Sequence, residues 1–174
     1  MSASDDQAPN YCAACPTNCC SPCIDLKVTR QEFDRCFAAH AEQLSIKDLG
    51  AYLEVTSSKT KDCPNFIDDR CAIYDIRPME CRLYPHSVQD IDVIPGGVRA
   101  YVHAGTRTCP QKSKLVAPEA EVLAMVRGFL DEAYPALPQT IVLEQDPSRF
   151  KLKWLRVSKQ AKRRVAAALG REIR

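Results

Sequence analysis

The chain has 174 residues, of which 45% are hydrophobic and 26% charged, the balance of an ordinary globular protein. No stretch approaches the roughly 18 consecutive apolar residues of a membrane-spanning helix. Residues 1–10 are polar and acidic, without the basic and apolar parts of a secretion signal. These features exclude a helical membrane protein and predict a protein of the reducing cytoplasm.

The N-terminal part of the chain is expected to lack regular structure. We expect residues 1–10 to be disordered. The cysteine-rich stretch 11–23 is interrupted by Pro16 and Pro22 and is expected to form a loop.

The first regular element is predicted to begin at residue 30. Thr29 and Glu32 have the spacing of a capping box, in which each side chain accepts a hydrogen bond from the other's backbone amide. Apolar and histidine side chains then recur at helical spacing, which predicts a helix near residues 30–44. A run of strand-forming residues follows at 52–56.

The middle of the chain alternates between irregular and regular predictions. Residues 63–85 are dense in Pro, Asp and Cys and predict a loop-rich segment that needs a cross-link, such as a bound metal, to hold it in place. Residues 98–103, bounded by glycines, predict a strand. Pro118 is a good first residue for a helix that ends near Ala133, with an apolar face of Val122, Met125, Val126, Phe129 and Leu130.

The C-terminal part differs from the rest in charge. Residues 149–174 hold ten Lys or Arg and one acid, whereas the remaining 148 residues hold 14 basic and 21 acidic side chains. Pro135 and Pro138 break the chain, and Asp146 precedes Pro147 as a second helix start. We predict a long basic amphipathic helix, which would either dock on the acidic remainder or bind an acidic protein, nucleic acid or a membrane surface.

These elements predict a small α+β fold. Its centre is a loop-rich, metal-stapled cysteine domain at 11–134, preceded by the disordered residues 1–10. A linker and the basic helix follow at 135–174. The sequence does not identify a binding partner. The partner could be another protein, for example one that exchanges electrons with the metal centre.

The chain contains ten cysteines, which is an unusual number for a protein of the cytoplasm: Cys12, Cys15, Cys19, Cys20, Cys23, Cys36, Cys63, Cys71, Cys81 and Cys109. Their density is below that of secreted disulfide scaffolds, and a reducing compartment disfavours disulfides. Closely spaced cysteines in that setting more often ligate metal.

The cysteine spacing is compatible with two kinds of metal centre. Two residues between cysteines, as in Cys12-x2-Cys15, let both sulfurs converge on one ion, which suits tetrahedral zinc and iron–sulfur clusters alike. The adjacent pair Cys19-Cys20 is awkward for a single tetrahedral site, because neighbouring side chains diverge. Spacing alone leaves the metal open.

The order of the motifs resembles the YkgJ-type cysteine-cluster family, described as zinc- or iron-chelating. The resemblance rests on Cys12-x2-Cys15-x3-Cys19-Cys20, Cys63-Pro64-x-Phe66-Ile67, Cys71-Ala72-Ile73-Tyr74, Arg77-Pro78-x2-Cys81-Arg82 and Cys109-Pro110. It covers roughly residues 12–110 and implies a bacterial, cytoplasmic protein with eight ligating cysteines. The family also resembles the cluster-bearing part of flagellin lysine N-methylases, which are much longer chains. Cys23 and Cys36 lie outside the pattern, and we expect Cys36→Ser to change neither metal content nor stability.

The resemblance favours an iron–sulfur cluster of the [4Fe–4S] type, with a redox, sensing or cluster-assisted modification role. Arg77 and Arg82 stand beside the cysteine motifs and could stabilise the negative charge of such a cluster. One alternative is a structural zinc module that presents the basic helix to nucleic acid or a protein partner. A second is an enzyme related to the S-adenosylmethionine-dependent lysine methyltransferases. The sequence leaves open whether the chain is an enzyme.

Overall fold

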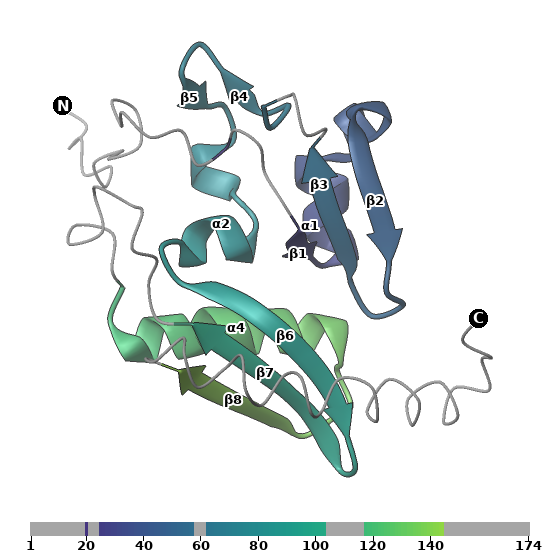
Figure 1. Cartoon of the computed structure of the whole chain (residues 1–174), viewed down its shortest axis with the longest axis vertical. Helices are drawn as coiled ribbons and strands as arrows, with labels where there is room; N and C mark the ends of the chain where they lie inside the picture. Colours follow the sequence, from purple (N-terminus) through teal and green to yellow (C-terminus); the bar gives the residue numbers. More distant parts are fainter. Residues whose placement is uncertain (1–19, 21–24, 58–61, 104–116, 145–174) are drawn as a thin grey trace, which may run out of the picture.

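The computed structural model describes residues 20, 25–57, 62–103 and 117–144, and it has the expected α+β composition (Figure 1). Its strands are β1 (Leu26–Val28), β2 (Leu44–Asp48), β3 (Leu53–Ser57), β4 (Phe66–Ile67), β5 (Arg70–Cys71), β6 (Ser87–Ile94), β7 (Gly97–His103) and β8 (Gln139–Glu144). Its helices are α1 (Arg30–Cys36), α2 (Met79–Leu83) and α4 (Glu119–Ala133), with the 3₁₀ turns η1 (Ala38–Gln43) and η2 (Tyr74–Ile76).

The first sheet has the antiparallel order β1-β3-β2, and α1 packs on it. Alternate residues of β3 are buried, as the two-residue period of a strand requires. The core between sheet and helix is small, with Val28, Cys36, Phe37, Leu53 and Val55 as its buried members.

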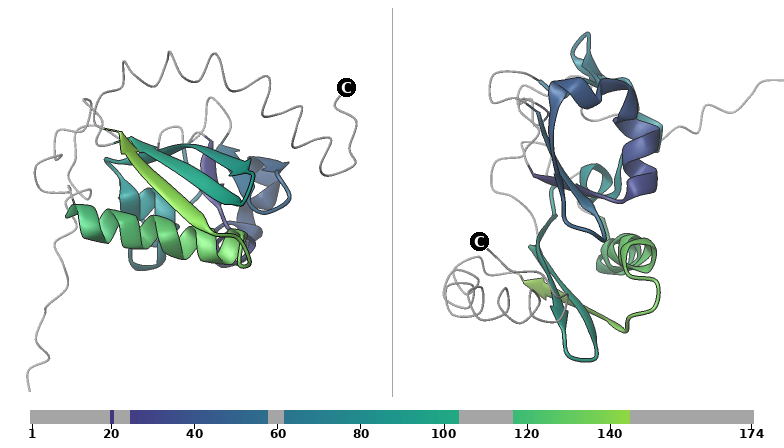
Figure 2. Two further views of the ribbon diagram at one scale, coloured as in Figure 1. Left: turned by 90° about the horizontal axis from the view of Figure 1, so that it is seen from below. Right: turned by 90° about the vertical axis from the view of Figure 1, so that its right-hand side faces the viewer.

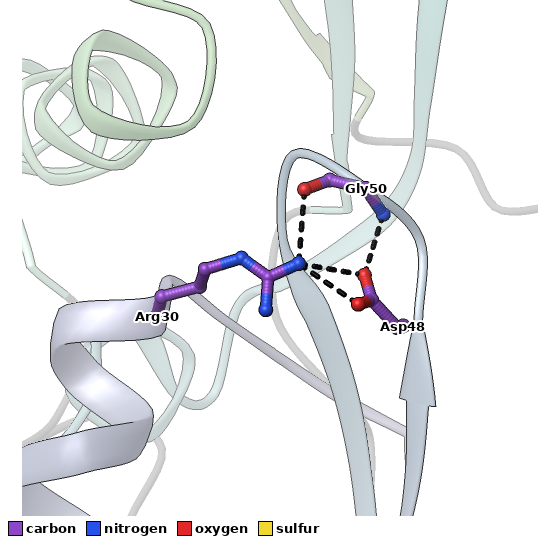
Figure 3. A network of polar contacts seen from close by, with 3 residues as sticks. All are labelled: Arg30, Asp48 and Gly50. Carbon is purple, nitrogen blue, oxygen red and sulfur yellow. Dashed lines mark hydrogen bonds and ion pairs between the residues drawn. The ribbon is translucent and has the colours of Figure 1, made fainter.

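The turn between β2 and β3 is fastened to the start of α1 (Figure 3). The Arg30 guanidinium donates to both carboxylate oxygens of Asp48, at 2.8 and 2.9 Å, and to the Gly50 carbonyl at 3.3 Å. The Gly50 amide donates to Asp48 at 2.8 Å. Gly50 has φ +86°, a left-handed conformation that glycine adopts without strain. This exposed network fixes the turn relative to α1.

The predicted capping box begins α1, but the helix is shorter than expected. The Thr29 hydroxyl accepts from the Glu32 amide and the Glu32 carboxylate accepts from the Thr29 amide, each at 3.1 Å. The helix ends at Cys36 rather than near residue 44, because the backbone of Phe37 is not helical, with φ −132°; the Phe37 residue is 1% exposed and belongs to the small core. The 3₁₀ turn η1 follows, kinked at His40.

The stretch predicted as loop-rich, 63–85, contains the four short elements β4, β5, η2 and α2. The hairpin β4–β5 turns through Asp68 and Asp69, which both have positive φ and are residue types suited to such turns. After η2, the five-residue helix α2 carries Cys81. Helix α2 contacts β1, β6 and α4, so it joins the two sheet regions.

The second sheet has the order β6-β7-β8, in which β6 and β7 are antiparallel and β7 and β8 are parallel. The predicted strand and the predicted helix in this region are confirmed as β7 and α4. Val98, Ala100 and Val102 of β7 are fully buried in the same core as the predicted apolar face of α4. A Cβ on Gly97 would lie 2.2 Å from the Pro138 carbonyl oxygen, so only glycine permits the close approach of the chain before β8.

Strand β8 lies within the segment expected to be a linker. Its residues 139–144 pair with β7, so the sheet continues beyond residue 134. The predicted disordered residues 1–10 and the predicted basic helix lie outside the described residues. No helix in the described part of the chain is long and apolar enough to cross a membrane.

Candidate metal centre

Four of the eight expected metal ligands are described: Cys20, Cys63, Cys71 and Cys81. All four side chains are partly exposed. No disulfide joins any two of the described cysteines. The other expected ligands, Cys12, Cys15, Cys19 and Cys109, lie outside the described residues.

One backbone hydrogen bond connects Cys20 and Cys63, which are far apart in the sequence. The Cys63 amide donates to the Cys20 carbonyl at 2.8 Å, and the Cys63 carbonyl accepts from the Phe66 amide at 2.8 Å. Phe66 is the partner of Cys71 in the β4–β5 hairpin. The fold thus links the first cysteine motif to the start of this hairpin, and Cys71 lies on its second strand.

Asn65 fixes this hairpin to α1. Its side chain, 5% exposed, donates to the Cys36 carbonyl at 2.8 Å, and its own carbonyl accepts from the Ala72 amide at 2.8 Å. A buried amide that bridges two elements holds them in one relative position. Asn65 was not among the predicted site residues, and a polar residue between Cys63 and the strand is too common a pattern to identify it.

Cys36 is a buried free thiol of the small core rather than part of the cysteine motifs. Its side chain is 4% exposed and donates to the Ile76 carbonyl at 3.3 Å. Burial raises the pKa of the Cys36 thiol, which keeps it protonated. The expectation that Cys36→Ser leaves stability unchanged is therefore revised: a hydroxyl in this core should cost about 1 kcal/mol or more.

Cys81 lies on α2, whose inward residues are buried. Met79 and Leu83 enter the larger core, and Glu80 is 9% exposed. The Glu80 carboxylate accepts from the amides of Lys27 at 2.7 Å and Val88 at 3.2 Å. Burial raises the pKa of Glu80 to about 7, although the nearby Lys27 charge and these amide bonds act to lower it.

A second buried carboxylate contacts the start of α2. One oxygen of Glu32 accepts from the Met79 amide at 2.6 Å, while the other completes the capping box of α1. Burial raises the pKa of Glu32 against these hydrogen bonds and the charge of Arg82. The capping-box pattern identified Glu32, but its second partner is 47 residues away and had no sequence signal.

The two arginines of the motif have different surroundings. Arg77 donates from Nε to the Tyr74 carbonyl at 2.6 Å, and its guanidinium carbon lies 3.5 Å from the centre of the Tyr74 ring. This cation–π contact closes η2 on itself. Arg82 is exposed and lines a groove between α1, α2 and α4 together with Glu32 and Glu132. Their predicted role beside a cluster stays a prediction.

The described thiols do not by themselves form a metal-binding group. Within the described residues, no three His, Cys, Asp or Glu side chains converge as a metal-binding group. A site built on Cys20, Cys63, Cys71 or Cys81 would therefore need ligands from outside the described residues. An all-thiolate donor set fits zinc and iron–sulfur clusters and does not suit magnesium or calcium.

The comparisons identify the family. A family model named CxxCxxCC, described as "Putative zinc- or iron-chelating domain", matches residues 11–110, a range that includes all eight motif cysteines. The chain belongs to this zinc- or iron-chelating family. The resemblance to the YkgJ-type proteins is thereby confirmed. No curated protein and no solved structure matches the chain.

Proposed function

We propose that this protein binds a metal centre through the thiolates of Cys12, Cys15, Cys19, Cys20, Cys63, Cys71, Cys81 and Cys109, and that the centre is an iron–sulfur cluster of the [4Fe–4S] type. The observation that carries the proposal is the family match over all eight cysteines. The backbone hydrogen bond from the Cys63 amide to the Cys20 carbonyl supports the proposal, because this bond brings the two cysteine groups together.

Two arguments favour the cluster over zinc. The resemblance to the cluster-bearing part of the lysine N-methylases suggests iron–sulfur chemistry. The vicinal Cys19-Cys20 pair suits a single tetrahedral ion poorly. A cluster in this position would serve a redox, sensing or cluster-assisted modification role, since these are the chemistries that such clusters provide.

The first experiment measures iron, zinc and acid-labile sulfide in the full chain purified without oxygen. Iron and sulfide in matching amounts, with a broad absorption band at about 400 nm, would establish the cluster. Zinc without acid-labile sulfide would show that the cysteines bind a structural zinc ion instead of a cluster. The assignment of the cysteines as thiolate ligands would then still hold. A protein without stoichiometric metal would overturn both.

Ligand replacement tests the residue assignment. Cys63→Ser and Cys81→Ser should each lose metal and stability, because each removes a thiolate and leaves an incomplete donor set. Cys36→Ser is the matched control: it should keep the full metal content and lose only the modest stability of a buried thiol. Full metal retention by Cys81→Ser would remove Cys81 from the ligand set.

A second candidate is a structural zinc module that presents its basic segment to an acidic protein or nucleic acid. The charge distribution favours it, because the described residues hold 18 acidic and nine basic side chains whereas residues 149–174 carry ten basic side chains. Salt-sensitive DNA binding that disappears when 149–174 is deleted would support it. A methyltransferase-like activity would instead require saturable S-adenosylmethionine binding by the metal-loaded chain.

A further inference from the structure

The helix that carries Cys81 is too short to hold its own position. Helix α2 has five residues, and its N-cap, Pro78, provides no side-chain hydrogen bond. Isolated helices of this length are unstable in water, so contacts with other elements must determine where Cys81 lies.

Glu80 makes contacts of the required kind. One carboxylate oxygen accepts from the Lys27 amide in β1, and the other accepts from the Val88 amide in β6. The two strands belong to different sheets. One side chain next to Cys81 therefore fastens α2 to both halves of the molecule.

Glu32 completes this support from the side of α1. Its carboxylate accepts from the Met79 amide, the first amide of α2. Met79 and Leu83 are 2% and 1% exposed and anchor the same helix in the larger core. Rotation or translation of α2 would break at least one of these contacts.

An apolar side chain would fill the position of Glu80 without the desolvation cost of a buried carboxylate. It could not accept two amide hydrogen bonds from two separate strands. What the carboxylate provides is therefore a fixed geometry, and a metal ligand needs fixed geometry more than most side chains do, because bond lengths to the metal are tightly constrained.

We propose that Glu80 is a positioning residue for the metal ligand Cys81, acting by holding α2 between the two sheets. The inference rests on the proposed function, since it takes Cys81 as a ligand. It adds a residue outside the cysteine and arginine motifs to the metal site.

The test compares metal release with stability in the metal-loaded full chain. In Glu80→Gln, an amide group replaces one acceptor oxygen, so one of the two backbone amides loses its partner. Release of iron to a ferrous chelator, or of zinc to a zinc chelator, should become about 10- to 100-fold faster, as for other residues that orient metal ligands. The visible circular dichroism of the bound centre should change as well.

Val98→Ala is the control for a purely structural effect. Val98 is fully buried in the larger core, but it lies on β7 opposite Val93, away from the Glu80 contacts. This variant should lose stability while its release rate stays within about twofold of the wild type once corrected for the unfolded fraction. Equal release from both variants at equal stability would overturn the proposal.

A second variant keeps the test decisive. If Glu80→Gln does not fold, Glu80→Asp retains the carboxyl group but is too short to reach both amides, and its release rate should lie between those of the wild type and an unfolded chain. A wild-type chain without metal would refute the proposed function itself, which is a different outcome.

Discussion

The two sheet regions of this protein differ in how they are held together. The region of β6–β8 and α4, here the α4 half, has a core of twelve buried residues, of which two come from α2 and one, Tyr52, comes from the turn before β3. The region of β1–β3, α1 and the β4–β5 hairpin, here the cysteine half, has five. In Figure 1 and in the right-hand view of Figure 2 the two halves lie one above the other, with the green helix α4 packed on its own sheet. The α4 half can therefore depend on apolar burial, whereas the cysteine half needs other support.

That support is visible as polar bridges. Asn65 joins the hairpin to α1, and Glu32 joins α1 to α2, both through buried hydrogen bonds. The free energy from such bonds is modest, about 1 kcal/mol each. Under the proposed function the remaining support comes from the metal, which binds the folded chain far more tightly than the unfolded one. We therefore infer that apolar burial stabilises the α4 half, whereas polar bridges and metal ligation stabilise the cysteine half.

Removal of the metal should have the largest effect and should separate the two halves. We expect chelation to lower the free energy of unfolding of the cysteine half by several kcal/mol, because binding free energy is then lost from the folded state. Hydrogen exchange followed by mass spectrometry should show lost protection in β3, β4 and β5 and retained protection in β7 and α4. Uniform loss across both halves would contradict the division.

Leu130→Ala should have the next largest effect. Leu130 is fully buried on α4, and its truncation leaves a cavity in the larger core. A loss of about 2–5 kcal/mol in the free energy of unfolding is expected from chemical denaturation. The variant should keep the metal content of the wild type in native buffer, since no motif cysteine lies on α4. Metal loss in the folded variant would show that the halves are more tightly coupled than we infer.

The pH dependence of stability should reveal the buried carboxylate of Glu32. Because burial raises the pKa of Glu32 in the folded state, the folded chain binds its proton more tightly than the unfolded chain. Its contribution is fully present below its ordinary value near 4.5 and is lost as the pH rises through the raised pKa. As the pH rises from about 4.5 through the raised pKa, the free energy of unfolding of the wild type should therefore fall relative to that of Glu32→Gln. Under the proposed function, protonation of the thiolate ligands affects both proteins equally and cancels in this difference. A stability difference that does not depend on pH would contradict the raised pKa of Glu32.

Asp48→Asn should have the smallest effect. The ion pair between Arg30 and Asp48 is 2.8 Å long, but both side chains are more than half exposed, so water and salt screen it. We expect a loss of less than about 1 kcal/mol that shrinks further at high salt. Thermal unfolding at two salt concentrations measures it. A loss comparable to that of Leu130→Ala would mean that the cysteine half depends on this surface contact.

The elements that the sequence predicted well are those with local signals. The capping box of Thr29 and Glu32 set the start of α1, and Pro118 with its apolar stripe set α4. A run of strand-forming residues bounded by glycines indicated β7. The end of α1 was wrong, because a stripe with helical spacing does not show that Phe37 turns into the core. Strand β8 was left as an apolar run, since its pairing partner β7 is distant in the sequence. Strands β2 and β6 were missed although short turns join them to their partners β3 and β7.

The candidate site divides in the same way. The cysteine motifs predicted the family, which the match over residues 11–110 confirms, and the identities of the eight ligands remain a prediction. No sequence pattern indicated that Asn65 and Glu80 would be buried as bridges, because each of their partners comes from another element.

What the amino-acid sequence determined alone is the chemistry of the protein: thiol donors in family spacing, two capped or proline-started helices, and a strong separation of charge. These depend on residue types and on neighbours within a few positions, where local geometry is nearly fixed. Only the tertiary structure decided that α2 lies between two sheets and that two buried carboxylates hold it there. Such contacts arise from packing between distant segments, and a burial that turns a glutamate into a bridge exists only after the chain has folded.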